Sequence, residues 1–213
     1  MFIVIEGLDG SGKATQSKKL YEYFKDNNKD TLHLSFPVYE SNSSSLVKMY
    51  LNGEISENLN DINAYAASTY YAVDRSAQFI KNNWKADYII ADRYTTSNMI
   101  YQTAKLSVNN WDEYLDWLYD FEYNRLNLPK PDIVIYLDVP ISISQDLIYK
   151  RYNNDNSKKD IHEKNIKYLY DCKKAADYVC EKYNWSIINC TENSKLKSVD
   201  KIFNEILTKI NYN

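Results

Sequence analysis

After Met1 the chain begins with Phe2-Ile3-Val4-Ile5-Glu6-Gly7-Leu8-Asp9-Gly10-Ser11-Gly12-Lys13-Ala14-Thr15, which holds three of its four glycines. An apolar run leads into the glycines and a helical pattern follows them, so the stretch predicts a strand, a tight turn and a helix start. Glycine allows positive φ and lets backbone N–H groups approach a ligand closely. Because free N–H groups and the helix dipole favour negative charge at a helix N-terminus, this loop is suited to an anion.

The spacing of Gly7 and Gly12-Lys13 matches G-x-x-x-x-G-K, the P-loop that cradles the phosphates of a nucleoside triphosphate. One position departs from the motif, because Ala14 stands where a hydroxyl usually follows the lysine. A glycine-rich turn without a ligand is the alternative, but it leaves the clustering of the glycines unexplained. The residues expected to contact the triphosphate are those of the whole loop: Gly7, Leu8, Asp9, Gly10, Ser11, Gly12, Lys13, Ala14 and Thr15.

Composition limits the class of protein. The 213 residues are 44% hydrophobic and 26% charged, which fits one soluble α/β domain. A net charge of −3 gives no sign of a broad basic surface for nucleic acid. Three cysteines without C-x-x-C spacing and two histidines argue against structural zinc and favour reduced thiols in the cytoplasm. The N-terminal apolar run is too short for a signal peptide, and no segment is expected to span a membrane.

Apolar runs and helical patterns alternate along the chain. The predicted strands are Phe2–Ile5, Thr31–Ser35, Tyr88–Ala91, Ile133–Leu137 and Trp185–Ile188. The predicted helices are Thr15–Asn27, Asp61–Trp84 with Asp61 as N-cap, Trp111–Arg125, Ile161–Tyr183 and Ser198–Asn211. This order predicts a single α/β domain over residues 1–213, with a parallel five-stranded sheet and helices on both faces. Ligands of such sheets bind at the carboxyl ends of the strands.

Two stretches of charged side chains could contact phosphates or a metal. Asp92-Arg93 comes directly after a predicted strand, where the carboxylate could hold Mg²⁺ and the guanidinium a phosphate. A capping Asp with a surface Arg is the alternative. Arg151 precedes a polar stretch at residues 153–159 that ends in two lysines, so we expect a lid at about residues 150–160 that closes over phosphates. A solvated charged loop is equally compatible with that stretch.

Tyr71 and Arg75 lie four residues apart on the longest predicted helix and therefore share a face. A ring and a guanidinium could together hold a nucleobase, by stacking and by hydrogen bonding. On spacing alone, an ordinary boundary between core and solvent is the better explanation of this pair. Phe36-Pro37 and Tyr39 follow the second strand, where they either reach a ligand or simply form the strand exit.

Five motifs in the same order resemble those of the thymidylate kinase family, in the pattern of its bacterial members. They cover most of residues 2–183: Glu6 to Lys13; Phe36-Pro37; Tyr71 to Asp74-Arg75; Asp92-Arg93-Tyr94 to Ser97-Asn98 and Tyr101-Gln102; and Leu128-Pro129-Lys130-Pro131-Asp132. The resemblance implies the P-loop nucleoside-monophosphate kinase fold and transfer of a phosphoryl group from ATP to dTMP, with Mg²⁺. It also implies a homodimer formed through long helices.

The resemblance also implies roles for individual residues. Catalysis falls to Lys13, Arg93, Asp9 and Arg151, and Mg²⁺ placement to Asp92, Asp9 and Glu163. Contacts to dTMP fall to Asp9, Phe36, Pro37, Tyr39, Tyr71, Arg75, Arg93, Asn98, Tyr101 and Glu163, with Tyr71 stacked on the base and Arg75 bonded to its edge. Three departures bear on these roles: Ala14 in the P-loop, Tyr39 where many members have arginine, and Arg151 as the sole arginine of the lid.

Two other functions stay open on sequence. One is a kinase on the same scaffold that acts on a deoxynucleoside or another monophosphate. The other is a P-loop module that binds nucleotide without turnover, which Ala14 makes conceivable. A GTPase is disfavoured because the chain has no Asn-Lys-x-Asp motif for reading guanine.

Overall fold

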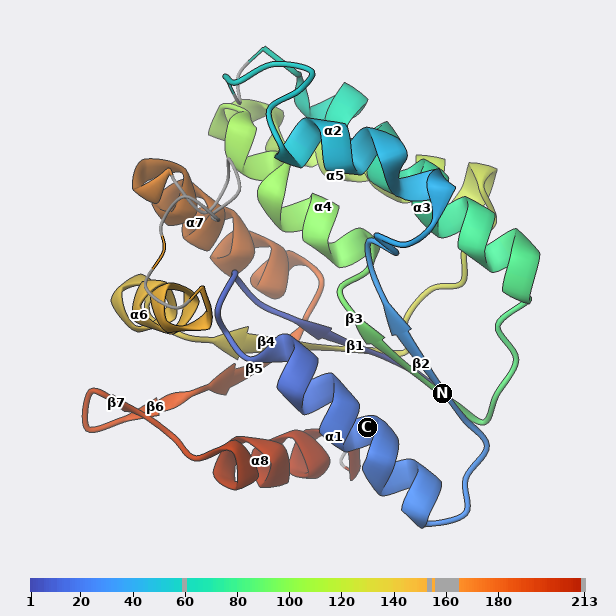
Figure 1. Cartoon of the computed structure of the whole chain (residues 1–213), viewed down its shortest axis with the longest axis vertical. Coiled ribbons are helices and arrows are strands. Elements are labelled where there is room, and N and C mark those ends of the chain that lie inside the picture. The colour runs from blue at the N-terminus through green and yellow to red at the C-terminus, as the bar shows by residue number, and fades with distance from the viewer. Residues whose placement is uncertain (59–60, 153–154, 156–164, 212–213) are drawn as a thin grey trace.

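A five-stranded parallel sheet in the order β2-β3-β1-β4-β5 forms the centre of the molecule (Figure 1). Its strands are β1 (Phe2–Glu6), β2 (Thr31–Ser35), β3 (Tyr88–Asp92), β4 (Ile133–Asp138) and β5 (Ser186–Asn189). The computed structural model describes residues 1–58, 61–152, 155 and 165–211. Because β1 lies between β3 and β4, the loop after β1 opens beside the ends of both neighbouring strands.

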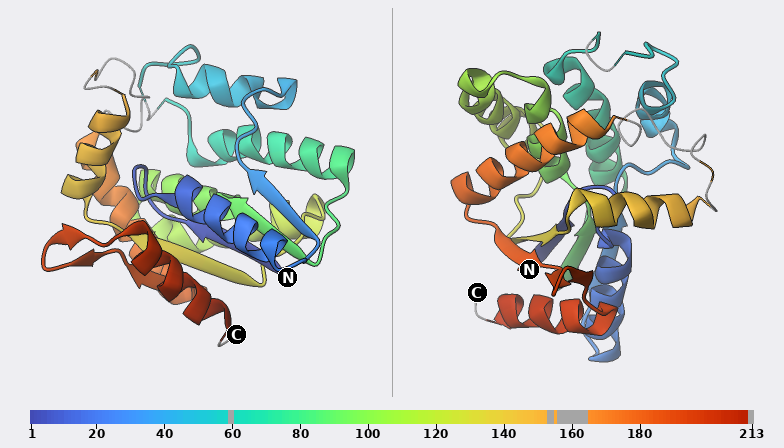
Figure 2. Two further views of the ribbon diagram at one scale, coloured as in Figure 1. Left: turned by 60° about the horizontal axis from the view of Figure 1, so that its bottom comes forward. Right: turned by 90° about the vertical axis from the view of Figure 1, so that its left-hand side faces the viewer.

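Helices cover both faces of the sheet (Figures 1 and 2). One face carries α1 (Lys13–Asp26) and α8 (Val199–Asn211). The other carries α3 (Ala64–Asn82), α4 (Thr95–Tyr101), α5 (Trp111–Tyr119) and α7 (Ile166–Lys182). The remaining elements are α2 (Ser45–Leu51), α6 (Ile141–Arg151), a π-helical turn (Asp120–Arg125), 3₁₀ turns (Asn42–Ser44, Thr103–Lys105, Val108–Asn110) and a peripheral hairpin of β6 (Thr191–Glu192) and β7 (Lys195–Leu196).

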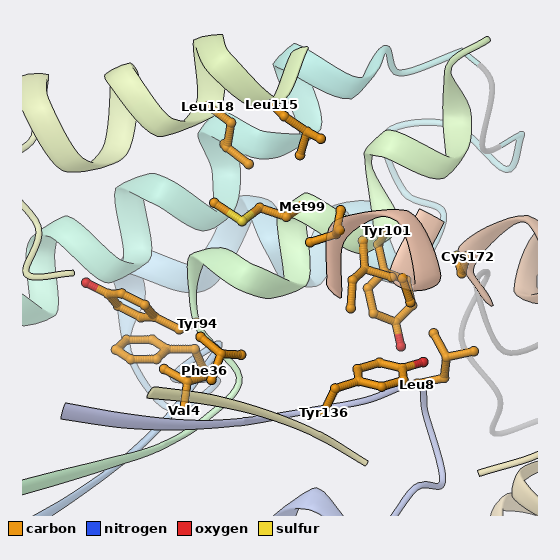
Figure 3. Packing of buried hydrophobic residues seen from close by; sticks show 14 of the residues in the cluster. Val4, Leu8, Phe36, Tyr94, Met99, Tyr101, Leu115, Leu118, Tyr136 and Cys172 are labelled. Atoms are coloured by element: carbon orange, nitrogen blue, oxygen red, sulfur yellow. The ribbon is translucent and has the colours of Figure 1, made fainter. Parts of the chain in front are cut away.

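The buried central strand shows how the two layers form. All five residues of β1 are buried, and alternate side chains enter opposite cores. Ile3 and Ile5 pack with the layer of α1 and α8, whereas Phe2 and Val4 pack with the larger layer. In the larger core, Phe36 and Tyr94 lie beside Val4, with their ring centroids 5.9 Å apart (Figure 3). These rings close the core just beneath the carboxyl ends of β2 and β3.

The predicted fold class and all five strands are confirmed. The predicted cap of the long helix is wrong, because Asn63 caps α3 by accepting a hydrogen bond from the N–H of Ala66 at 2.8 Å. Asp61 instead accepts hydrogen bonds from Ser56 and Asn58 in the preceding turn. Three helices that the sequence analysis omitted, α2, α4 and α6, are short or rich in β-branched residues, and packing stabilises them against that weak propensity.

Two further expectations fall partly on residues that are not described. The predicted helix Ile161–Tyr183 corresponds to α7, whose N-cap is Asn165, while residues 161–164 lie outside the described residues. Of the lid expected at residues 150–160, the structure describes 150–152 and 155. Among the described residues, no helix is both long and apolar enough to cross a membrane.

Candidate active site

The glycine loop after β1 is held in shape by its neighbours. Gly10 has φ of 77°, and a Cβ at this position would lie 2.5 Å from the backbone oxygen of Ser144 in α6. A Cβ at Gly7 would meet the side-chain oxygen of Ser11 at 2.5 Å. A larger residue at Gly10 would therefore push the loop away from α6, and one at Gly7 would push Ser11 out of place. The glycines permit both the turn and the close packing of the loop.

Lys13 turns back over this loop. Its Nζ donates a hydrogen bond to the backbone oxygen of Leu8 at 2.8 Å, and the side chain is 6% exposed. Burial, together with the positive charge of nearby Arg93, lowers the pKa of Lys13 to about 8, and the acidic side chains of Asp9 and Asp92 only partly oppose this shift. The ammonium is therefore poorly compensated, which favours the arrival of an anion.

An open cavity lies over the loop and the start of α1. Its lining brings together most of the residues predicted to contact the triphosphate, to act in catalysis or to place the metal: Asp9, Gly10, Gly12, Lys13, Ala14, Thr15, Asp92, Arg93 and Arg151. Leu147 and Ile148 of α6 complete the wall. Gly7, Leu8 and Ser11 lie below this surface, and Leu8 belongs to the hydrophobic core. Arg151 donates to the hydroxyl of Tyr152 at 3.1 Å.

A second pocket adjoins this cavity; we call the first the donor cavity and the second the acceptor pocket, after the roles that are proposed for them below. It contains every predicted dTMP residue that the structure describes: Asp9, Phe36, Pro37, Tyr39, Tyr71, Arg75, Arg93, Asn98 and Tyr101. Leu51, Tyr94, Ser97 and Gln102 also line it. Glu163 lies outside the described residues. The two cavities share Asp9 and Arg93, so a ligand in each would meet at these side chains.

Arg93 occupies the junction between the cavities. Its φ of 66° is unusual for a residue other than glycine and turns the chain sharply between β3 and α4. The guanidinium donates to Asp9 and, at 3.3 Å, to the hydroxyl of Ser97. Burial alone would lower the pKa of Arg93, but Asp9 and other acidic neighbours raise it well above its usual value. Arg93 is therefore a fixed positive charge at the junction.

Asp9 is held on its other side by Tyr101. The phenol of Tyr101 donates to Oδ2 of Asp9 at 2.9 Å. Burial and the negative charge of Asp9 raise the pKa of Tyr101 well above its usual value, so the phenol keeps its proton and acts as a donor. Both carboxylate oxygens of Asp9 thus already accept hydrogen bonds.

The carboxylate of Asp92 differs from that of Asp9, because only Asp9 accepts hydrogen bonds on both oxygens within the described residues. The side chain of Asp92 is 9% exposed, and Oδ1 is buried without a hydrogen-bond partner in the described part of the chain. A buried carboxylate oxygen without a donor is costly, and a cation would relieve that cost. Asp92 also lines the donor cavity. The residues present therefore fit Mg²⁺ at Asp92 better than at Asp9, although the described residues form no cluster of three or more candidate ligands.

The base end of the acceptor pocket is built on a buried ion pair. Arg75 donates from Nε to Oε2 of Glu122 at 2.8 Å and from Nη2 to Oε1 at 2.5 Å. Burial would lower the pKa of Arg75, but Glu122 raises it, so the guanidinium stays charged. Asn98 donates to the same Oε1 at 3.2 Å. Tyr71 lines the pocket from the same helix as Arg75.

Several functional candidates had received no role from the sequence. The amide of Gln102 is buried, lines the acceptor pocket and has no hydrogen-bond partner on Nε2 or Oε1 among the described residues. It lies four residues after Asn98, a spacing that signals one helix face. Glu122 could have been noticed because it follows Leu115 and Leu118 at helical spacing on an apolar face.

Two further buried carboxylates support loops of the site. Glu6, fully buried, accepts from the backbone of Gly7 at 3.0 Å and from Thr96 and Ser97 at 2.8 Å. It thereby ties the P-loop to the start of α4. Asp74 accepts from the backbone of Val38 at 2.8 Å, which fixes the segment after β2 that carries three lining residues.

The family model described as thymidylate kinase matches residues 5–202. The thymidylate kinase of Plasmodium falciparum is 31% identical over 213 residues, which cover 98% of this chain and 89% of that protein. The thymidylate kinase of Mycobacterium tuberculosis is 33% identical over 159 residues, 73% of each chain. A solved thymidylate kinase from Candida albicans shares the fold, with a TM-score of 0.72 and 20% identity over 99% of this chain and 91% of that one. On these matches the chain belongs to the thymidylate kinase family.

Proposed function

We propose that this chain transfers the γ-phosphoryl group of ATP to dTMP, giving ADP and dTDP for dTTP synthesis, with the two cavities as donor and acceptor sites. The observation that carries the assignment of sites is their meeting point at Asp9 and Arg93. In-line transfer requires two anionic ligands to approach one another, and the partly buried guanidinium of Arg93 at that meeting point supports such an approach. Family membership supports the reaction itself.

In the donor cavity, the backbone N–H groups of the P-loop and the ammonium of Lys13 bind the ATP phosphates. Lys13 exchanges its bond to the oxygen of Leu8 for phosphate oxygens, which compensate its charge better than a neutral carbonyl does. Arg151 adds positive charge from the end of α6. These fixed charges stabilise negative charge that builds up on the bridging oxygen during transfer.

In the acceptor pocket, Tyr71 stacks on thymine, and Arg75 and Asn98 bond to its polar edge. Gln102 supplies a further polar contact, since its buried amide has no partner among the described residues and lines the same pocket. Phe36, Pro37 and Tyr39 form the wall contributed by the segment after β2. Tyr101 and Asp9 are assigned to the sugar, because both line this pocket, Tyr101 donates to Asp9, and Asp9 pairs with Arg93 at the junction.

Arg93 holds the phosphate of dTMP and aligns it with the γ-phosphoryl group. Its position is fixed by Ser97 and Asp9, so little reorganisation is needed when the substrate arrives. A general base is not required, because the second ionisation of a phosphate monoester has a pKa of about 6. Catalysis therefore depends on positioning and charge neutralisation.

Asp92 would hold Mg²⁺, directly or through water, with Asp9 and Glu163 as further candidates. The metal would neutralise charge on the phosphates when it is bound. Ala14 removes one inner-sphere ligand, a loss that is tolerable because Mg²⁺ keeps several waters and takes few protein ligands. A lid at about residues 150–160, a single domain over residues 1–213, a homodimer and a cytoplasmic location also belong to the proposal.

The test is ADP release in the presence of ATP, measured with dTMP, dUMP, dCMP, dAMP and dGMP in turn. The proposal expects Mg²⁺-dependent release that is fastest with dTMP. Faster turnover of another monophosphate would reassign the acceptor pocket. ATP binding without release for any acceptor would instead indicate a nucleotide-binding module.

A further inference from the structure

Glu122 is a fully buried carboxylate that does not line the acceptor pocket, yet it contacts two residues that do. Arg75 donates to it from Nε and Nη2, at 2.8 and 2.5 Å, and Asn98 donates from Nδ2 at 3.2 Å. Glu122 lies in the π-helical turn after α5. Such turns are rare and often occur at functional sites. The carboxylate therefore controls two binding side chains at once.

The first consequence concerns the donors of Arg75. A guanidinium has five N–H groups in a rigid plane. Two of them go to Glu122, and Nη1 donates weakly to the backbone oxygen of Tyr94 at 3.4 Å. The remaining N–H groups donate to no residue in the described ranges. Because the bidentate pair fixes the plane, these donors keep one orientation at the pocket that Arg75 lines.

The second consequence concerns the amide of Asn98. An ionised carboxylate only accepts hydrogen bonds, so the amide must turn its NH₂ group toward Glu122. The same Nδ2 donates to the backbone oxygen of Ser68 at 3.3 Å, which uses both of its hydrogens. Oδ1 of Asn98 has no donor among the described residues and is left as an acceptor at the pocket that Asn98 lines.

We propose that Glu122 is a positioning residue that sets base selectivity, by holding Arg75 as a donor and Asn98 as an acceptor side by side. A pyrimidine with a 4-oxo group and a hydrogen on N3 presents the complementary acceptor and donor. A 4-aminopyrimidine presents the reverse pattern, with a donor at N4 and an acceptor at N3. It would therefore place a donor against Arg75 and an acceptor against Asn98. The inference rests on the proposed function, since it assumes that this pocket takes a pyrimidine monophosphate.

A purely structural ion pair would behave differently on substitution. In Glu122→Gln the new side chain carries both a donor and an acceptor, so the plane of Arg75 loosens and the amide of Asn98 is held only by its 3.3 Å bond to the backbone oxygen of Ser68. If Glu122 sets selectivity, the ratio of kcat/KM for dTMP to that for dCMP falls. If Glu122 only supports the fold, both substrates lose activity equally and that ratio stays constant.

The experiment compares wild type, Glu122→Gln, Glu122→Asp and the control Glu113→Gln, which changes an exposed acid on the adjoining helix α5. We expect Glu122→Gln to lower the dTMP-to-dCMP ratio about tenfold or more, through the KM for dTMP, with the KM for ATP and the control unchanged. The aspartate variant keeps the charge but is one methylene shorter, so its ratio should fall between those of wild type and the glutamine variant.

An unchanged ratio in folded Glu122→Gln would overturn the inference. If that variant does not fold, the aspartate variant decides: a ratio lowered about threefold or more supports the inference, and an unchanged ratio overturns it. A wild type that does not turn over dTMP would instead be a failure of the proposed function. Selectivity would then be measured by calorimetric binding of dTMP and dCMP, with the same expected order of variants.

Discussion

The charged residues of the site are constrained by their immediate partners. Lys13 is buried against a backbone oxygen, and Arg93 is fixed by Asp9 and Ser97. Arg75 is neutralised by Glu122 within the protein. The first two lie where phosphates are proposed to bind, and the third lies at the base end of the acceptor pocket. The sequence could therefore identify these cations, but it could not show which already have a counter-ion.

The lowered pKa of Lys13 predicts a pH dependence. The protonated ammonium binds ATP, and in the free protein it loses its proton as the pH rises through about 8. We therefore expect kcat/KM for ATP to be constant below that pH and to fall above it. In Lys13→Arg this fall should vanish, because guanidinium stays charged. The same fall in the arginine variant would assign the titration to another group, such as Lys105, whose pKa burial also lowers to about 8.

The free energy of unfolding of the ligand-free protein should rise over the pH range in which kcat/KM for ATP falls. The folded state holds the Lys13 proton less tightly than the unfolded state does, so between about pH 8 and 10.5 unfolding takes up a proton. This group therefore contributes an increase in the free energy of unfolding as the pH rises through that window. Urea denaturation of wild type and Lys13→Met at pH 7.5 and 9.5 would measure it, and an equal pH response in both proteins would contradict it.

Base choice depends on Arg75. Replacement by alanine removes the donor for the base and leaves the buried carboxylate of Glu122 without its main partner, so we expect weaker dTMP binding and lower stability. The wild type should prefer dTMP over dCMP roughly tenfold or more, and Arg75→Ala should lose most of that preference. Steady-state kinetics with both nucleotides, together with a melting curve, separates the two effects. A preference that survives in Arg75→Ala would contradict the assignment.

At the scale of elements, the strands and long helices were predictable because their apolar spacing is regular. The short helices α4 and α6 were not, although α4 carries Asn98 and Tyr101 and α6 ends at Arg151. Their sequences contain several threonines and isoleucines, whose intrinsic helix propensity is modest, and tertiary packing decides their conformation. The motifs therefore pointed to candidate site residues before the elements that carry them could be predicted.

The residues at the start of α1 and at the end of β3 predict how turnover depends on Mg²⁺. Position 14 offers a methyl group, whereas Asp92 offers a buried oxygen without a partner among the described residues. We expect Mg²⁺-dependent turnover in the wild type, a small effect of Ala14→Thr and a much larger loss in Asp92→Asn. Turnover measured against Mg²⁺ concentration compares the three proteins. A wild type that is inactive at every concentration and is rescued by Ala14→Thr would contradict the account.

At the scale of the whole molecule, one property of parallel sheets accounts for the site. The carboxyl ends of β1, β2 and β3 lie at the same edge, so three segments distant in sequence meet there. This convergence was predictable from the alternation of strands and helices. The buried pairing of Arg75 with Glu122 was not, because it joins residues 47 positions apart through packing of α3 against the turn after α5.

Two exposed apolar side chains on α3 allow a test of the expected homodimer. Val73 and Ile80 lie seven residues apart on one face of this helix and are 51% and 78% exposed. We expect sedimentation to give the mass of a dimer, and Val73→Asp with Ile80→Asp to shift it toward the monomer. An unchanged mass in the double variant would place the interface elsewhere, and a monomeric wild type would contradict the expectation.

The central claim is that these two cavities carry phosphoryl transfer from ATP to dTMP. The most direct measurement uses γ-labelled ATP with dTMP and Mg²⁺ and follows the label into dTDP, for wild type and for folded Lys13→Ala. The account predicts labelled dTDP from the wild type. In the variant the rate of label transfer should fall by about tenfold to a hundredfold or more. Label that stays in ATP or appears only as free phosphate, or equal transfer by Lys13→Ala, would contradict it.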